Sequence, residues 1–195
     1  AVDVRQLGGG DNSALGDERE GGGPVLRQRG AEKGFSVETM TDLGEWGGAP
    51  GSSRRVREAL AAGDMATVNG CLGRHHSVRG PVVKGDQRGR TIGFPTANLA
   101  LWDELLLPGF GVYATYATIH GRRYAAATNV GVRPTVNGSG VTIEAHLLDF
   151  DEDIYGEEMR LEFVQRTRAE MKFAGLEALK AQIVADVEEV RRMAR

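Results

Sequence analysis

Cysteine is almost absent from the sequence, since Cys71 is the only one among 195 residues. One thiol cannot form an internal disulfide, so we expect the protein to work in a reducing compartment. A structural zinc site also has few candidate ligands, because the chain has only four histidines and they are scattered. The lone thiol has no evident histidine partner and no G-x-S-x-G segment occurs, which argues against nucleophilic hydrolysis.

Long apolar runs and a basic excess are missing as well. No run approaches the roughly 18 apolar residues that a membrane-spanning helix needs, and the first residues lack the basic-then-apolar pattern of a signal peptide. The net charge of −3 offers no basic excess for nucleic acid or an anionic membrane. We therefore expect a cytoplasmic protein whose partners include neither nucleic acid nor a membrane. Because the sequence begins at Ala1 rather than Met, we also expect a fragment or a processed product.

Residues 1–50 are rich in glycine and poor in sustained periodicity. Such polar, glycine-rich stretches bury too little apolar surface to offset chain entropy, so we expect much of 1–30 to be loop or disordered. A helical turn or two is expected before a strand at Phe35–Met40. This part is therefore predicted to be a small, partly disordered α/β segment.

Residues 51–73 change to a helical period and are predicted to form a helical linker. Ser53 is a suitable N-cap for a first helix, and Gly63 is a suitable stop. Asp64 then suits the N-cap of a second short helix that ends at Gly73.

Residues 74–195 are predicted to form one domain, dominated by period two up to about residue 165. In VTIEAHLLDF (141–150) one face holds Val141, Ile143, Ala145 and Leu147, and the other holds Thr142, Glu144 and His146. Further strand candidates are GVYATYATI, RRYAAATNV and EMRLEFVQR, which turn material separates. Several strands at this spacing, without useful helices between them, predict a mainly β fold in which an antiparallel sheet closes into a barrel.

The end of the chain has the pattern of one amphipathic helix. Its apolar stripe, at helical spacing, consists of Leu176, Leu179, Ile183, Val187 and Val190. We expect this stripe to pack against the barrel and not to line a ligand site.

The glycine-rich segment 80–98 is the first candidate site. Gly80 and Gly85 have the spacing of a Walker A loop, but the positions where that loop needs Lys and Ser or Thr hold Asp and Gln. Lys84 and Arg90 supply positive charge, and recurrent glycines let the backbone approach a ligand closely. An ordinary hairpin connection is the alternative.

Thr96 and Asn98 stand two residues apart in the PTAN end of this segment. In an extended chain their side chains point the same way, so their oxygens could converge on one metal ion or one phosphate. A hydroxyl oxygen is a hard ligand that suits Mg²⁺.

Glu144 lies on the polar face of its predicted strand. It is either a general base at the mouth of the barrel or a solvated surface glutamate. The acidic residues that follow form either a metal ligand set or a solvated turn; they are Asp149, Asp151, Glu152 and Asp153.

The segment RTRAEMKF (166–173) combines cationic, apolar and aromatic residues between the last strand and the helix. Stacking and apolar contact of this kind suit a planar aromatic ligand. Alternatively it is an ordinary connection that buries Met171 and Phe173 in the core.

These pieces, in this order, resemble the riboflavin kinase family, specifically the kinase module at the C-terminus of bacterial bifunctional FAD synthetases. The resemblance runs from about Leu72 to the end of the chain. It rests on GRTIGFPTAN (89–98), LPGFGVYAT (107–115), TNVGVRPTV (128–136), IEAHLLDF (143–150), IYGEEMRLEFV (154–164) and RAEMKFAGLEALKAQI (168–183).

The resemblance implies a six-stranded antiparallel Greek-key barrel with a C-terminal α-helix, and a Mg²⁺-dependent transfer of phosphate from ATP to riboflavin that yields FMN and ADP. In this family of flavoproteins, the PTAN segment and the glycine loop hold ATP and the metal without a Walker lysine. Thr96 and Asn98 would then contact the metal and the phosphates. Four residues would shape the nucleotide loop: Gly80, Lys84, Gly85 and Arg90.

The same resemblance assigns the remaining site residues. Glu144, in IEAHL, matches the proposed catalytic base, and Arg168, Met171 and Phe173 match the loop that closes over the flavin ring. Asp86 would repel a triphosphate, so we expect it to face solvent.

Residues 1–70 resemble the tail of the adenylyltransferase half of the bifunctional enzymes. In GSSRRVREAL (51–60), Ser52, Ser53 and Arg57 match a family segment, whereas Arg54 stands where threonine is expected. The chain contains no H-x-G-H-type element, and we expect no nucleotide-binding βα unit before Ser52. We interpret these residues as a remnant without FMN adenylyltransferase activity.

Two other functions remain open from the sequence. One is a barrel that binds flavin or nucleotide without turnover, against which the intact PTAN and IEAHL blocks argue. The other is a fragment of a complete bifunctional FAD synthetase.

Overall fold

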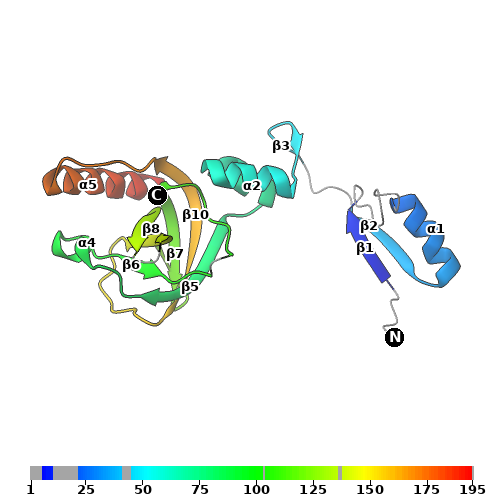
Figure 1. Ribbon diagram of the computed structural model, residues 1–195, viewed down its shortest axis with the longest axis horizontal. Helices are drawn as coiled ribbons and strands as arrows, with labels where there is room; N and C mark the ends of the chain where they lie inside the picture. Colours follow the sequence, from blue (N-terminus) through cyan, green and yellow to red (C-terminus); the bar gives the residue numbers. More distant parts are fainter. Residues whose placement is uncertain (1–5, 11–21, 41–44, 103, 136–137, 195) are drawn as a thin grey trace. The chain divides into compact units, whose positions relative to one another are not determined.

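The computed structural model describes residues 6–10, 22–40, 45–102, 104–135 and 138–194 (Figure 1). The chain divides into two compact units, Ala1–Gly51 and Ser52–Arg195.

The first unit contains a parallel strand pair with a helix between its strands. Strand β1 (Gln6–Gly10) pairs in parallel with β2 (Ser36–Met40), and α1 (Gly23–Lys33) connects them. Strands β3 (Glu45–Trp46) and β4 (Ala49–Pro50) form a short antiparallel pair. Gly30 is required inside α1, because a Cβ there would lie 2.5 Å from the Phe35 carbonyl oxygen.

Strand β1 and most of α1 lie within residues 1–30, where much loop or disorder was expected, while residues 1–5 and 11–21 of that stretch lie outside the described residues. A unit of βαβ topology precedes Ser52, and the expectation that no nucleotide-binding unit does so stays a prediction. The predicted strand at Phe35–Met40 is present as β2.

Two capped helices begin the second unit. Helix α2 (Ser53–Ala62) has Ser52, one residue before the expected cap, as the acceptor for the Arg55 N–H at 3.2 Å. Helix α3 (Met65–Leu72) begins after Asp64, whose carboxylate accepts from the Thr67 N–H at 3.1 Å.

Both helices end as the sequence predicts, at Gly63 (φ +75°) and Gly73 (φ +64°), a left-handed conformation that glycine adopts without strain. They are also part of the barrel's core, to which they contribute Leu60, Met65 and Val68.

Six antiparallel strands close into a barrel in the order β10-β5-β6-β9-β8-β7. The strands are β5 (His76–Val83), β6 (Ala97–Leu99), β7 (Gly111–Ile119), β8 (Arg122–Thr135), β9 (Gly138–Leu147) and β10 (Glu158–Arg168). Because β6 lies beside β9 and not beside β7, strands β6 to β9 form a Greek key. The predicted fold class is confirmed.

The alternation predicted for β9 holds over most of the strand. Ile143, Ala145 and Leu147 are buried in the core, but Val141 is 45% exposed. The reason is that β6 pairs with β9 only as far as Ile143. Val141 lies beyond that point, where β8 and β9 continue as a two-stranded extension and Val141 pairs with Val132.

Helix α5 (Leu176–Met193) follows β10 and packs on β7 and β8 (Figure 1). Only the C-terminal half of its stripe is held in the core, where Val187 and Val190 pack with Ala114 and Leu148. Among the described residues, no helix is both long and apolar enough to cross a membrane.

Candidate active site

One row of residues crosses five strands of the barrel at the same level. In strand order the directly paired residues are Asn98, Glu144, Asn129, Val112 and Arg168. Directly paired residues point to the same face of a sheet. Because Ile143 and Ala145, on either side of Glu144, are buried inside the barrel, this row faces outward.

A cavity of about 680 Å³ covers most of this outward face. Its floor is the strand row from Glu144 to Arg168, and the segment between β10 and α5 contributes Met171 and Phe173. Its volume lies within the range of sites for organic ligands. The remaining wall residues that matter here are Thr96, His146, Leu176, Leu179 and Ile183.

The stripe of α5 therefore has two roles along its length. Leu176, Leu179 and Ile183 line the cavity, whereas the later members pack on the barrel. The expectation that the whole stripe packs on the barrel and lines no ligand site is wrong for its N-terminal half. Helical period alone does not distinguish a face that covers a sheet from one that covers a cavity.

A second cavity, of about 340 Å³, also has Thr96 in its lining. Arg90 supplies a cation to it, and Phe150 and Tyr155 supply aromatic rings. Asp151, Glu152 and Asp153 also border it, and all three residues are exposed. Among the described residues, Thr96 alone borders both cavities.

Asn98 is 8% exposed and lies directly across the strand pair from Glu144. Its side-chain amide packs on Gly85, where a Cβ would lie 2.5 Å from Nδ2. Gly85 therefore makes room for the amide. Asn98 and Glu144 are directly paired on β6 and β9, but only Thr96 and Glu144 line the larger cavity, and Asn98 lines neither cavity.

The other residues of the predicted nucleotide loop are spread more widely. Gly80 belongs to β5, where a Cβ would lie 2.2 Å from the Ala100 carbonyl oxygen, and it lines neither cavity. Its glycine is explained by strand packing and not by a phosphate loop. Lys84 Nζ lies 5.4 Å from the ring centroid of Tyr155, at the smaller cavity. Arg90 belongs to the short helix α4 (Arg88–Thr91).

Two acidic residues near the cavities are engaged elsewhere. Asp86 is exposed, as expected, with its carboxylate 3.6 Å from the Arg88 guanidinium. Asp149 accepts a hydrogen bond of 2.7 Å from Arg191, which lowers the pKa of its carboxyl group. Within the described ranges, no group of three or more His, Cys, Asp or Glu side chains is arranged to hold a metal.

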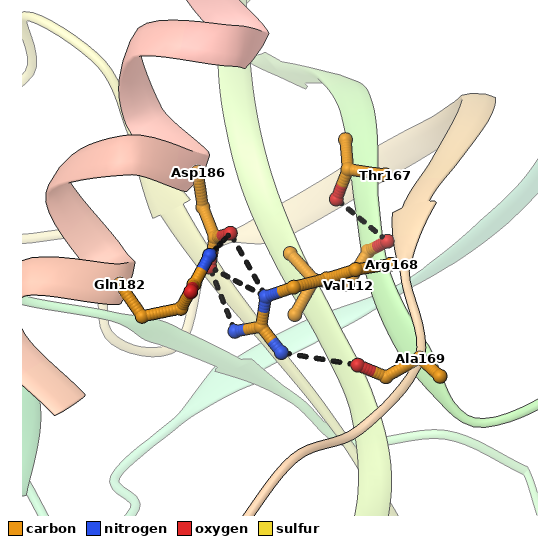
Figure 2. A network of polar contacts seen from close by, with 6 residues as sticks. All are labelled: Val112, Thr167, Arg168, Ala169, Gln182 and Asp186. Carbon is orange, nitrogen blue, oxygen red and sulfur yellow. Dashed lines mark hydrogen bonds and ion pairs between the residues drawn. The ribbon is translucent and has the colours of Figure 1, made fainter. Parts of the chain in front are cut away.

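Arg168 is fixed by a carboxylate of helix α5 (Figure 2). Its Nη2 lies 2.7 Å from Asp186 Oδ2 and its Nε 2.9 Å from Oδ1, while Gln182 donates to the same carboxylate at 2.9 Å. The Arg168 guanidinium also lies 5.8 Å from the ring centroid of Phe173. Of the three residues predicted at a flavin loop, Arg168 and Phe173 thus lie within cation–π distance of each other, and both line the larger cavity, as does Met171.

Among the cavity residues that were missed from the sequence are Asn129, His146 and Asp186. Alternation on β9 already placed His146 on the face of Glu144, and this signal could have been followed. Asn129 becomes a candidate only once β8 is paired with β9, and Asp186 only once α5 is docked.

Residues 72–194 match the sequence pattern described as Flavokinase, the riboflavin kinase family. The chain belongs to the riboflavin kinase family. It is 40% identical over 192 residues to a bifunctional riboflavin kinase/FMN adenylyltransferase of Pseudomonas fluorescens. The aligned residues cover 98% of this chain and 61% of that protein. A protein of the same description from Escherichia coli K12 is 40% identical over 184 residues, which is 94% of this chain and 58% of the relative.

This member of the riboflavin kinase family also has a solved structural counterpart. A Streptococcus pneumoniae crystal structure, described as a macrolide-efflux protein, superposes with a TM-score of 0.82 at 33% identity. The superposition covers 93% of this chain and 58% of that one. The chain thus spans about three fifths of the relatives that it matches.

Proposed function

We propose that this protein is a riboflavin kinase, which transfers the γ-phosphate of ATP to the 5′-hydroxyl of riboflavin. The observation that carries this proposal is the position of Thr96, which borders both cavities, beside a larger cavity that contains Glu144. A two-substrate transfer needs two adjoining sites with the acceptor hydroxyl and the donor phosphate meeting at their boundary.

The larger cavity suits the flavin. Phe173, Met171, Leu179 and Ile183 offer an apolar and aromatic wall for a planar ring system. The polar row on the floor, with Glu144 nearest to Thr96 along the sheet, suits the hydroxyl-bearing ribityl chain.

The smaller cavity suits the nucleotide. Arg90 offers a cation for the phosphates, and Tyr155 and Phe150 offer rings beside a purine. The carboxylates from Asp151 to Asp153 accept hydrogen bonds from hydroxyl or amino groups, so we place the adenosine end near them and the phosphates near Thr96.

Two oxygen donors near the boundary suit a magnesium ion. Thr96, just before β6, and Asn98, within β6, offer a hydroxyl and an amide oxygen, hard ligands of the kind that Mg²⁺ prefers. When bound, the ion neutralises charge on the transferring phosphoryl group.

Glu144 acts as the general base in this proposal. The riboflavin 5′-oxygen forms a new bond to the γ-phosphorus, the bond from that phosphorus to the β,γ-bridging oxygen breaks, and ADP leaves. The hydroxyl proton passes to the Glu144 carboxylate, a contribution typically worth about 10²- to 10⁴-fold in rate.

The decisive experiment incubates the protein with riboflavin and MgATP and follows FMN by chromatography, with a parallel sample containing a chelator. We expect FMN in the first sample and none in the second. Riboflavin binding without any FMN would instead establish a non-catalytic barrel. A second incubation with FMN and MgATP tests the bifunctional alternative, and we expect no FAD, because the chain lacks the H-x-G-H-type element.

A further inference from the structure

His146 lies two residues after Glu144 on β9 and lines the larger cavity beside it. Its Nδ1 lies 2.8 Å from the carbonyl oxygen of Pro95. A carbonyl oxygen only accepts hydrogen bonds, so this geometry requires a proton on Nδ1. The imidazole is thereby a donor to the backbone that precedes Thr96.

The hydrogen bond between His146 and Pro95 lies where no backbone pairing joins β9 to the residues before β6. The first residue of β6 that pairs with β9 is Ala97, which lies opposite Ala145. Pro95 and Thr96 precede Ala97 and form no pair in this ladder. Proline has no N–H to extend the ladder. The Pro95 carbonyl group and the Thr96 nitrogen belong to one peptide unit. The hydrogen bond from His146 therefore restrains the orientation of that unit.

The imidazole ring is itself held in place. The Phe94 ring contacts it edge to face, with centroids 5.4 Å apart and planes at 77°. His146 therefore contacts both residues that precede Thr96: Phe94 through its ring and Pro95 through its Nδ1.

We propose that His146 is a positioning residue for phosphoryl transfer, which holds the Thr96 hydroxyl at the boundary of the two cavities through the Pro95 carbonyl. The inference rests on the proposed kinase function. Thr96 must face both substrates at once, and a misplacement of about 1 Å in such a group can cost about 10²-fold in rate. His146 itself takes no proton from the substrate in this scheme.

Two substitutions separate the hydrogen bond from the ring. His146→Phe keeps a ring against Phe94 and removes the donor, whereas His146→Asn places an amide nitrogen at the position of Nδ1 and removes the ring. We expect kcat to fall about 10- to 100-fold in His146→Phe and to return to within a few-fold of wild type in His146→Asn. Riboflavin affinity, followed by quenching of its fluorescence, should change far less than kcat in both variants.

A merely structural role for the ring predicts the reverse order, with His146→Phe active and His146→Asn impaired, and that result would overturn the inference. The tautomer gives a test that needs no variant. Nitrogen-15 NMR of the wild-type imidazole should show a protonated Nδ1, and a neutral ring protonated only at Nε2 would refute the proposal. If the wild-type protein forms no FMN, the kinase function itself fails; an active wild type with an equally active His146→Phe refutes only the role of His146.

Discussion

Arg168 and Asp186 form a two-point ion pair that joins the end of strand β10 to helix α5 (Figure 2). Asp186 is one of the few buried polar residues of the barrel unit, and its side chain is only 6% exposed. The pair sits under Phe173 and beside the part of α5 that lines the larger cavity. It therefore links the stability of the fold to the shape of the proposed flavin site.

Removing the Asp186 carboxylate should lower both the stability of the fold and the affinity for riboflavin. In Asp186→Ala the Arg168 guanidinium keeps its charge in a largely buried place, and breaking a buried pair in this way typically costs about 3–5 kcal/mol. We expect a drop of this size in the free energy of unfolding, measured by denaturant titration, together with weaker riboflavin binding.

The exposed pair between Arg191 and Asp149 provides the control, because it joins the same helix to the barrel at a solvent-exposed position. Arg191→Ala should leave riboflavin binding unchanged. Equal losses of binding in the two variants would show that α5 docking in general, and not the Arg168–Asp186 pair, shapes the cavity.

Glu144→Ala should abolish most FMN formation while nucleotide binding stays nearly intact. The carboxylate faces the larger cavity, and loss of a general base typically lowers kcat by about 10²- to 10⁴-fold. Steady-state kinetics and MgADP binding by calorimetry measure the two effects. Glu158→Ala, an exposed glutamate that lines neither cavity, is the matched control. Near-wild-type turnover by Glu144→Ala would remove this residue from the mechanism.

Gly85→Ala should impair turnover through Asn98. A methyl group at this position would lie 2.5 Å from the Asn98 amide, so the amide must move or the segment must shift, at a typical cost of about 1–3 kcal/mol. We expect a raised KM for MgATP and a lowered kcat. Gly140→Ala is the comparison, since a Cβ at Gly140 meets nothing within 4 Å. If Gly85→Ala binds and turns over MgATP normally, Asn98 is not part of the site.

Asp64 gives a prediction about pH and stability. Its hydrogen bond to Thr67 lowers the pKa of the folded carboxyl group below the ordinary value of 3.8. A folded pKa below the unfolded one means that the stabilisation is fully present above pH 3.8 and is lost as the pH falls through the folded pKa. Asp64→Ala should cost about 1 kcal/mol at pH 7 and less at strongly acidic pH.

Asp64→Asn separates the cap from its charge. Asparagine caps helices about as well as aspartate but does not titrate. Thermal unfolding followed between pH 2 and pH 7 should therefore show the wild-type cap weakening in acid and the asparagine cap staying constant. The same pH profile for both proteins would contradict the assigned hydrogen bond.

Much of the fold follows from local patterns in the chain. Alternation identified β9 and its polar face, and the capping residues placed the ends of α2 and α3 within one residue. In the glycine-rich start, β1 pairs with β2, which lies far along the chain, and no local pattern indicated that pairing. Propensity describes a segment by itself, whereas pairing depends on the segment that it meets.

Some of the predicted site residues line the cavities, whereas Gly80, Lys84, Gly85 and Asn98 line neither. PTAN, IEAHL and the segment 166–173 pointed to Thr96, Glu144 and Phe173, all of which line the cavities. Gly80 shared the same glycine-rich segment and proved to be a strand residue packed on Ala100. A glycine records that a side chain does not fit, and only the neighbouring atoms show whether a ligand or a strand is the reason.

The amino-acid sequence by itself determined that this protein is a mainly β member of the riboflavin kinase family with a C-terminal helix, because side-chain period and motif order are properties of the chain. The tertiary structure alone decided that Asn98 is paired with Glu144, that Thr96 borders two cavities and that half of the α5 stripe lines one of them. Strand register and helix docking are set by hydrogen bonds and packing between distant segments, which no local pattern specifies.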